Sequence, residues 1–188
     1  MNFTRMAHAL AAEFLPEIKY AVDATAGCGR DALFLAKKLS EGGRVFCFDV
    51  QAEAIARTRA LLLKNGVLGR AEFYNAGHER MAELLPPFAA GKINCFFFNL
   101  GWLPNSDKRV ATRADTTVAA LRAALALADK RACLVSVLCY KAHRGGMEEF
   151  DAVADFISSC GFAAERFCDA SNALSPELFA LKIGGLKK

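Results

Sequence analysis

The stretch that decides the fold is residues 21–36, which read AVDATAGCGRDALFLA. An apolar run at 20–22 leads into Asp23, a tight turn follows with Gly27 and Gly29, and a helical pattern comes next. A strand, a glycine turn and a helix in this order are typical of the first unit of a nucleotide-binding α/β fold. The rest of the sequence indicates which nucleotide the turn would hold.

Length and composition limit the class of protein. The chain has 188 residues, of which 54% are hydrophobic and 23% charged, and its formal net charge is +4. We expect a single α/β domain over residues 1–188 with a large core. The mild positive charge is compatible with an anionic partner but does not indicate one. The seven cysteines include no C-x-x-C pair, which favours a cytoplasmic protein without zinc or a disulfide framework.

The N-terminal residues predict an amphipathic helix. Within residues 1–15, Phe3, Met6, Leu10 and Phe14 recur at helical spacing, and we expect this helix to pack on the domain. No apolar run reaches secretory or membrane-spanning length, so we expect no membrane partner.

After the opening unit, strand and helix patterns alternate along the chain. We expect strands at 44–49, 71–75, 93–99 and 131–140, helices at 53–64, 79–85, 116–128 and 147–160, and two final strands at 163–168 and 178–183. Five βα units followed by a strand pair predict a Rossmann-like α/β fold. It would contain a doubly wound, mostly parallel sheet of seven strands, with helices on both faces and a terminal antiparallel strand.

The glycine turn formally matches the G-x-G-x-x-A fingerprint of dinucleotide sites, but its surroundings favour another cofactor. Asp23 lies four residues before Gly27, where a carboxylate would repel a pyrophosphate. S-adenosylmethionine (SAM) has no phosphate and carries a sulfonium and an α-amino group, both cationic. Asp49, at the end of the next strand, is placed to accept both ribose hydroxyls. The structural alternative is that Asp23 caps the turn and Asp49 merely ends its strand.

The strand expected at 93–99 ends in Asn99-Leu100-Gly101-Trp102. An Asn side-chain oxygen and a backbone carbonyl can accept both N–H bonds of a primary amine, which aims the nitrogen lone pair at a methyl group. Trp102 could stack on a base or anchor a buried edge. His143 is the best candidate for a proton acceptor, with a structural role equally open.

Six segments carry a closer resemblance to a known family. DATAGCGRDALFLA, FDVQAEAIARTR, AGHERM, FNLGWLPNSDK, ADTTVAAL and YKAH occur in this order. Over nearly its whole length the chain resembles the YtqB/MnmM family of small class I SAM-dependent tRNA methyltransferases. The resemblance implies N-methylation of 5-aminomethyl-2-thiouridine at the tRNA wobble position. The product nucleoside would be 5-methylaminomethyl-2-thiouridine, and SAM would become S-adenosylhomocysteine (SAH). The implied partner is the tRNA anticodon stem-loop; a homodimer is open, and no metal is expected.

Matched by position, the resemblance also implies roles for residues of this chain. SAM would be bound by Asp23, Thr25, Gly27, Gly29, Asp31, Asp49, Gln51, Gly77, His78 and Asn99. Catalysis would involve Asn99, Asp107 and His143, and the substrate would contact Gly101, Trp102, Lys108, Tyr140 and Lys141. Thr116 and Thr117 would do no more than start their helix.

The chain departs from the family pattern in three places. Cys28 stands where the family has Asn, Trp102 where it has Tyr, and Lys141-Ala142 where it has His-Gly. The last change leaves His143 without a second histidine, and Lys141 could instead contact a phosphate.

Two other functions stay open on the sequence alone. A SAM-dependent enzyme with this site could act on rRNA or on a small-molecule amine, because the chain has no appended RNA-binding module. A non-catalytic SAM-binding protein could keep the fold and lack the chemistry, although Asn99, Asp107 and Lys108 are all present.

Overall fold

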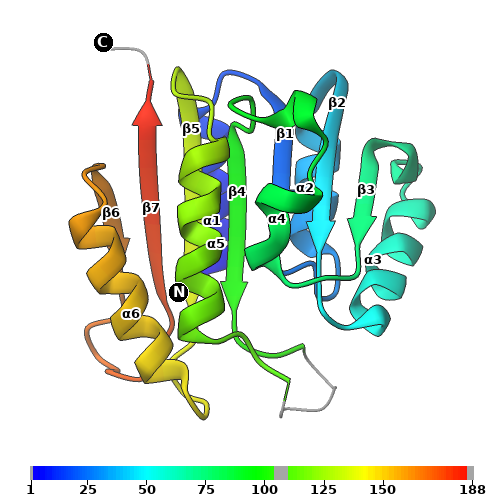
Figure 1. Cartoon of the computed structure of the whole chain (residues 1–188). Coiled ribbons are helices and arrows are strands. Elements are labelled where there is room, and N and C mark those ends of the chain that lie inside the picture. Colours follow the sequence, from blue (N-terminus) through cyan, green and yellow to red (C-terminus); the bar gives the residue numbers. More distant parts are fainter. Residues whose placement is uncertain (1, 104–109, 186–188) are drawn as a thin grey trace.

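The computed structural model describes residues 2–103 and 110–185 (Figure 1). The helices are α1 (Phe3–Phe14), α2 (Arg30–Lys38), α3 (Ala52–Lys64), α4 (Met81–Leu84), α5 (Ala114–Leu127) and α6 (Gly146–Ser159). Three short 3-10 helices are η1 (Leu68–Arg70), η2 (His78–Arg80) and η3 (Pro87–Ala89). The strands are β1 (Ile18–Asp23), β2 (Leu39–Phe48), β3 (Ala71–Tyr74), β4 (Cys95–Leu100), β5 (Ala132–Cys139), β6 (Ala164–Phe167) and β7 (Glu177–Gly184). The expected order of elements is confirmed.

The strands form one seven-stranded sheet in the order β3-β2-β1-β4-β5-β7-β6. Strands β1 to β5 pair in parallel, whereas β7 runs antiparallel between β5 and β6. The strand order reverses between β1 and β4, and ligands of open α/β sheets bind at such a switch point, beyond the carboxyl ends of the strands. In Figure 1 the carboxyl ends of the parallel strands β2, β3 and β4 lie at the lower edge of the sheet, whereas β7 points the opposite way.

Alternate residues of the central strands pack on opposite faces of the sheet. Phe96 and Phe98 lie in the core cluster shared with α5 and α6. Their neighbours Cys95 and Phe97 lie in the cluster shared with α1 and α2. Burial on both faces explains why β4 reads as a continuous apolar run, CFFFNL.

Helix α1 is held against the sheet by its small residues. Ala7 and Ala11 are buried, and the helix contacts β5 and β7. It lies behind the sheet in Figure 1, on the face opposite α5. Within the part of the chain that the structure describes, no helix has the length and apolar character needed to cross a membrane.

The first glycine turn is pressed against α3. Gly29 adopts φ +80°, and a Cβ built on it would lie only 2.9 Å from the Cα of Thr58. The Thr58 hydroxyl lies within hydrogen-bonding distance of the carbonyls of Ala26 and Gly27, at 3.4 and 3.3 Å. Glycine is therefore required at position 29 both for its conformation and for the close approach of two backbones.

We expect Gly29→Ala to lower the free energy of unfolding by about 3 kcal/mol, the sum of left-handed strain and overpacking. Gly66→Ala is a matched control, because Gly66 has φ +71° but no atom within 4 Å of its built Cβ. The control should lose only about 1–2 kcal/mol of stability, because it adds left-handed strain without overpacking. Urea unfolding of both variants measures the difference, and equal losses would contradict the close approach to Thr58.

Candidate cofactor and acceptor site

A cavity of about 620 Å³ opens at the carboxyl edge of the parallel strands. Its volume lies in the range of small-molecule and cofactor sites. Many of the predicted site residues line it, namely Thr25, Gly27, Asp31, Asp49, Gln51, Gly77, His78, Asn99, Gly101, Trp102 and Tyr140. The wall also includes Thr4 of α1, Arg30, Thr112 and Arg113, which sequence reasoning did not select. Residues Asp107 and Lys108 lie outside the described part of the chain.

The glycine turn binds a carboxylate of the protein itself. The Gly27 N–H donates to Asp49 Oδ2 at 3.0 Å, and the Gln51 N–H donates to Asp49 Oδ1 at 2.9 Å. In a dinucleotide site the amides of this turn would face a pyrophosphate. Here the Gly27 amide already donates to the Asp49 carboxylate. The turn is therefore poorly suited to a phosphate.

Asp23 is fully buried behind this turn and is not part of the cavity wall. The Thr25 N–H donates to its Oδ1 at 3.3 Å, whereas Oδ2 has no hydrogen-bond partner. Burial raises the pKa of the Asp23 carboxyl well above its usual range, and the charges of Asp31 and Asp49 raise it further. Three acids around one turn thus repel one another, and a cation bound beside them would relieve that repulsion.

His78 is buried on the cavity wall, where η2 begins. Its Nδ1 donates to the Ala24 carbonyl at 3.1 Å, since a carbonyl oxygen can only accept. Burial lowers the pKa of the imidazole, which favours the neutral ring at neutral pH. Its role in closing the pocket around an adenine stays a prediction.

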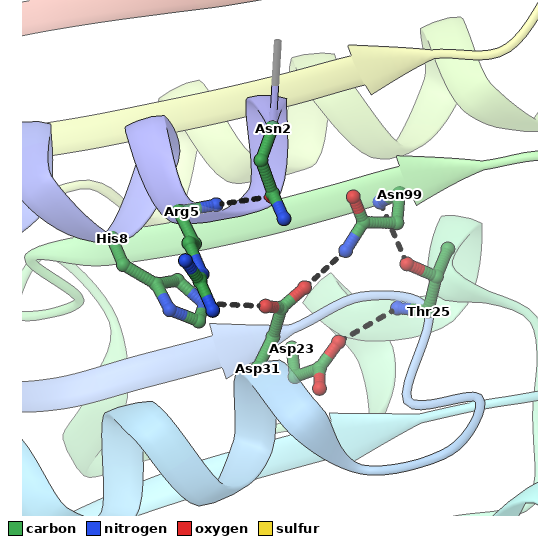
Figure 2. A network of polar contacts seen from close by, with 7 residues as sticks. All are labelled: Asn2, Arg5, His8, Asp23, Thr25, Asp31 and Asn99. Atoms are coloured by element: carbon green, nitrogen blue, oxygen red, sulfur yellow. Dashed lines mark hydrogen bonds and ion pairs between the residues drawn. The ribbon is translucent and has the colours of Figure 1, made fainter.

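Asn99 lies near the end of β4 with its amide group in one fixed orientation. Its backbone N–H donates to the Thr25 hydroxyl at 2.8 Å, and its side-chain Nδ2 donates to Asp31 Oδ2. Figure 2 shows the amide nitrogen turned toward Asp31. Because a carboxylate can only accept hydrogen bonds, this pairing leaves the Asn99 oxygen facing away from Asp31, available as an acceptor.

A buried glutamate anchors the loop that follows β4. The Gly101 N–H donates to the Thr112 hydroxyl at 2.8 Å, and that hydroxyl donates to Glu149 of α6 at 2.7 Å. The Thr117 hydroxyl of α5 donates to the second Glu149 oxygen at 2.6 Å. The prediction that Thr117 only starts a helix is therefore incomplete, because it also fixes the carboxylate that holds the Gly101 loop. Helix α5 begins at Ala114, with Arg113 as its N-cap.

Two predicted residues after β5 are not on the cavity wall. His143 lies edge-on to Trp102, with the ring centroids 5.0 Å apart, and its Nδ1 donates to the Arg144 carbonyl at 3.0 Å. Lys141 is buried, and its ammonium is 2.6 Å from Glu177 of β7. The prediction that Lys141 contacts the substrate or a phosphate is therefore wrong, because its charge is already neutralised inside the protein.

Comparison with known proteins assigns the family. Residues 45–170 match the family described as "Putative rRNA methylase". The chain is also 34% identical over 163 residues to the chloroplastic tRNA (mnm(5)s(2)U34)-methyltransferase of Arabidopsis thaliana. That alignment covers 81% of this chain and 58% of the relative, so the chain spans well under two thirds of the relative's length. The chain therefore belongs to the methyltransferase family described as "Putative rRNA methylase". The resemblance of its motifs to the YtqB/MnmM methyltransferases is confirmed.

Solved structures agree with this assignment. A "putative rRNA-methylase" from Clostridium thermocellum is 32% identical, with a TM-score of 0.88 over 97% of this chain and 98% of that one. A "putative methyltransferase" from Streptococcus mutans, solved in complex with SAH, is 25% identical, with a TM-score of 0.84 and the same coverage. The O-methyltransferase TomG from Streptomyces achromogenes is 16% identical and shares the fold, with a TM-score of 0.70 over 96% of this chain and 79% of that one. The predicted Rossmann-like class I methyltransferase fold is confirmed.

The raised pKa of Asp23 makes stability depend on pH. An acid whose pKa is higher in the folded state favours folding most below its unfolded pKa and loses that contribution as pH rises toward the folded pKa. We therefore expect Asp23→Asn to raise the free energy of unfolding at pH 7 by about 1 kcal/mol or more. The gain should shrink as the pH falls toward 4, because the carboxyl of the unfolded chain then also becomes increasingly protonated. Thermal unfolding between pH 4 and 8 tests this, and a gain that does not change with pH would contradict it.

Proposed function

We propose that this protein is a SAM-dependent tRNA methyltransferase that acts on the aminomethyl group of 5-aminomethyl-2-thiouridine at the wobble position. The product nucleoside is 5-methylaminomethyl-2-thiouridine. The observation that carries the proposal is the fixed Asn99 amide at the end of β4, with its oxygen available beside the acid-lined glycine turn. The name of the Arabidopsis relative gives the same nucleoside class.

The acid cluster supports SAM as the cofactor. SAM, when bound, supplies a methyl carbon on a positively charged sulfur, and its α-amino group is also cationic. Asp31 and Asp49 line the cavity and match these charges better than they would match a diphosphate. Asp49 also retains acceptor capacity for ribose hydroxyls, because a carboxylate has about four lone-pair sites and two are used here.

The acceptor side supports a primary amine as substrate. The Asn99 oxygen would accept one amine N–H and a backbone carbonyl would accept the other, so that the nitrogen lone pair points toward the methyl carbon. The transfer step itself needs no base, because the nitrogen keeps its protons and becomes a secondary ammonium ion. His143 would then act by supporting the Trp102 ring, which its own ring contacts edge-on.

An aromatic ring and two arginines on the cavity wall support the proposal of an RNA substrate. Trp102 lines the wall and can stack on a base. Arg30 and Arg113 also line the cavity, and both are exposed. Guanidinium groups at the rim of a nucleotide pocket are suited to contacts with phosphates, which position an RNA without reading its sequence.

We expect Asn99→Ala to reduce kcat for methyl transfer by about 100-fold, because the amine loses the group that orients it. SAM affinity should change little, since Asp49 and the glycine turn remain. Single-turnover kinetics and calorimetric titration with SAM measure the two effects separately. A parallel loss of SAM affinity and activity would mean that Asn99 acts on the cofactor or on folding.

We expect Trp102→Ala to weaken tRNA binding by the loss of one stacked base, about 1–3 kcal/mol. Trp102→Tyr should retain most of the affinity because a phenol ring can also stack. Phe88→Ala is a control, since Phe88 is exposed but is not part of the cavity wall. Binding of an anticodon stem-loop to the three variants gives the comparison, and equal affinities would exclude stacking on Trp102.

The reaction itself is tested by mass spectrometry of nucleosides. tRNA that carries 5-aminomethyl-2-thiouridine is incubated with the protein and SAM, and then digested. We expect the methylated nucleoside to appear only when protein and SAM are both present. A parallel incubation with unmodified rRNA tests the activity that the family description names; methylation there and none in tRNA would overturn the tRNA proposal.

A further inference from the structure

We propose that His8 of α1 is a positioning residue for the transfer reaction, acting through Asp31 on Asn99. This inference rests on the proposed methylation of an amine held by Asn99. It gives the N-terminal helix a part in the active site beyond its packing on the sheet.

The three side chains form one continuous network (Figure 2). His8 Nε2 lies 2.6 Å from Asp31 Oδ1, and the Asn99 amide nitrogen contacts the other oxygen of the same carboxylate. Asp31 is buried near the start of α2 and also lines the cavity. The network thus joins α1, α2 and β4 at the point where the amine would be held.

The directions of these hydrogen bonds follow from the chemistry of the groups. An ionised carboxylate only accepts, so His8 Nε2 and Asn99 Nδ2 both donate to Asp31. The last torsion of an Asp side chain is broad, and a carboxylate held on one oxygen alone can turn. With donors on both oxygens, the Asp31 plane is fixed, and with it the orientation of the Asn99 amide. Removing His8 would release the plane and allow the amide to turn its oxygen out of place.

The His8 ring is itself held in position. It stacks on Phe34 with the centroids 3.9 Å apart and an interplanar angle of 4°, and its centroid is 5.6 Å from that of Phe97. At the start of the same helix, the Arg5 N–H donates to the Asn2 side chain at 3.0 Å. The stack fixes the plane of the imidazole and so the direction of its Nε2–H.

A ring that only packed against Phe34 would need no nitrogen, and this distinction gives the test. His8→Phe keeps an aromatic ring against Phe34 and removes the donor to Asp31. His8→Gln loses the ring but places an amide N–H at about the reach of Nε2. Glu13→Gln is the control on the same helix, at an exposed position away from the cavity wall.

The measurements are kcat with tRNA that carries 5-aminomethyl-2-thiouridine, SAM affinity by calorimetry, and the melting temperature. We expect His8→Phe to keep its melting temperature and SAM affinity but to lower kcat about 10- to 100-fold. We expect His8→Gln to melt earlier and yet recover much of the wild-type kcat. Glu13→Gln should match the wild type in all three measurements.

The outcomes separate this inference from the proposed function. If the wild-type protein transfers no methyl group to this tRNA, the proposed function fails. If the wild type is active and His8→Phe keeps the wild-type kcat, the proposed role of His8 is wrong while the function stands. A His8→Gln variant that is as inactive as His8→Phe would also overturn it, because donation to Asp31 would not restore the reaction.

Discussion

The repulsion among three carboxylates at the first glycine turn is the constraint on which the site depends. The Asp49 carboxylate accepts a hydrogen bond from the Gly27 N–H. The charges of Asp31 and Asp49 also raise the pKa of the buried Asp23 carboxyl. Such a turn is poorly suited to the diphosphate that its glycine spacing would otherwise favour, and it is better suited to a cationic ligand. One oxygen of the buried Asp23 has no hydrogen-bond partner, and strongly shifted pKa values of this kind are found most often at functional sites.

One of these acids, Asp31, connects the glycine turn to the end of β4 across the cavity wall. Asp31 lies in the first turn of α2, directly after the glycine turn. Its carboxylate accepts a hydrogen bond from the Asn99 side chain near the end of β4. Thr25, in the turn, accepts the backbone N–H of Asn99. Under the proposed function, the group that would orient the amine is therefore fixed by the element that would hold the cofactor, and a shift of the turn would displace both. Glu149 performs a similar task for the Gly101 loop from the other face of the sheet.

The fold could be predicted because its signals are local. A continuous apolar strand such as β4 and the stop signals of the helices are visible in short windows of sequence. Asp49 and Asn99 could also be placed on the cavity wall, because residues near the carboxyl ends of parallel strands meet at one edge. The sheet order brings them together without any knowledge of side chains.

The contacts that sequence reasoning missed or misjudged all join distant segments. Glu149 reads as an ordinary polar position of α6, and only the packing of α5 shows that it is buried between two threonines. Lys141 reads as a free cation after a strand, but the returning strand β7 places Glu177 against it. His8 lies 23 residues from Asp31 along the chain, and no local pattern links a histidine of the first helix to the second.

Calorimetric titration of the protein with SAM and, in parallel, with NAD tests the central claim most directly. The account predicts saturable binding of SAM and no binding of NAD at the same concentrations, because the acids around the glycine turn attract the cationic cofactor and repel the diphosphate. Binding of NAD without binding of SAM would contradict it.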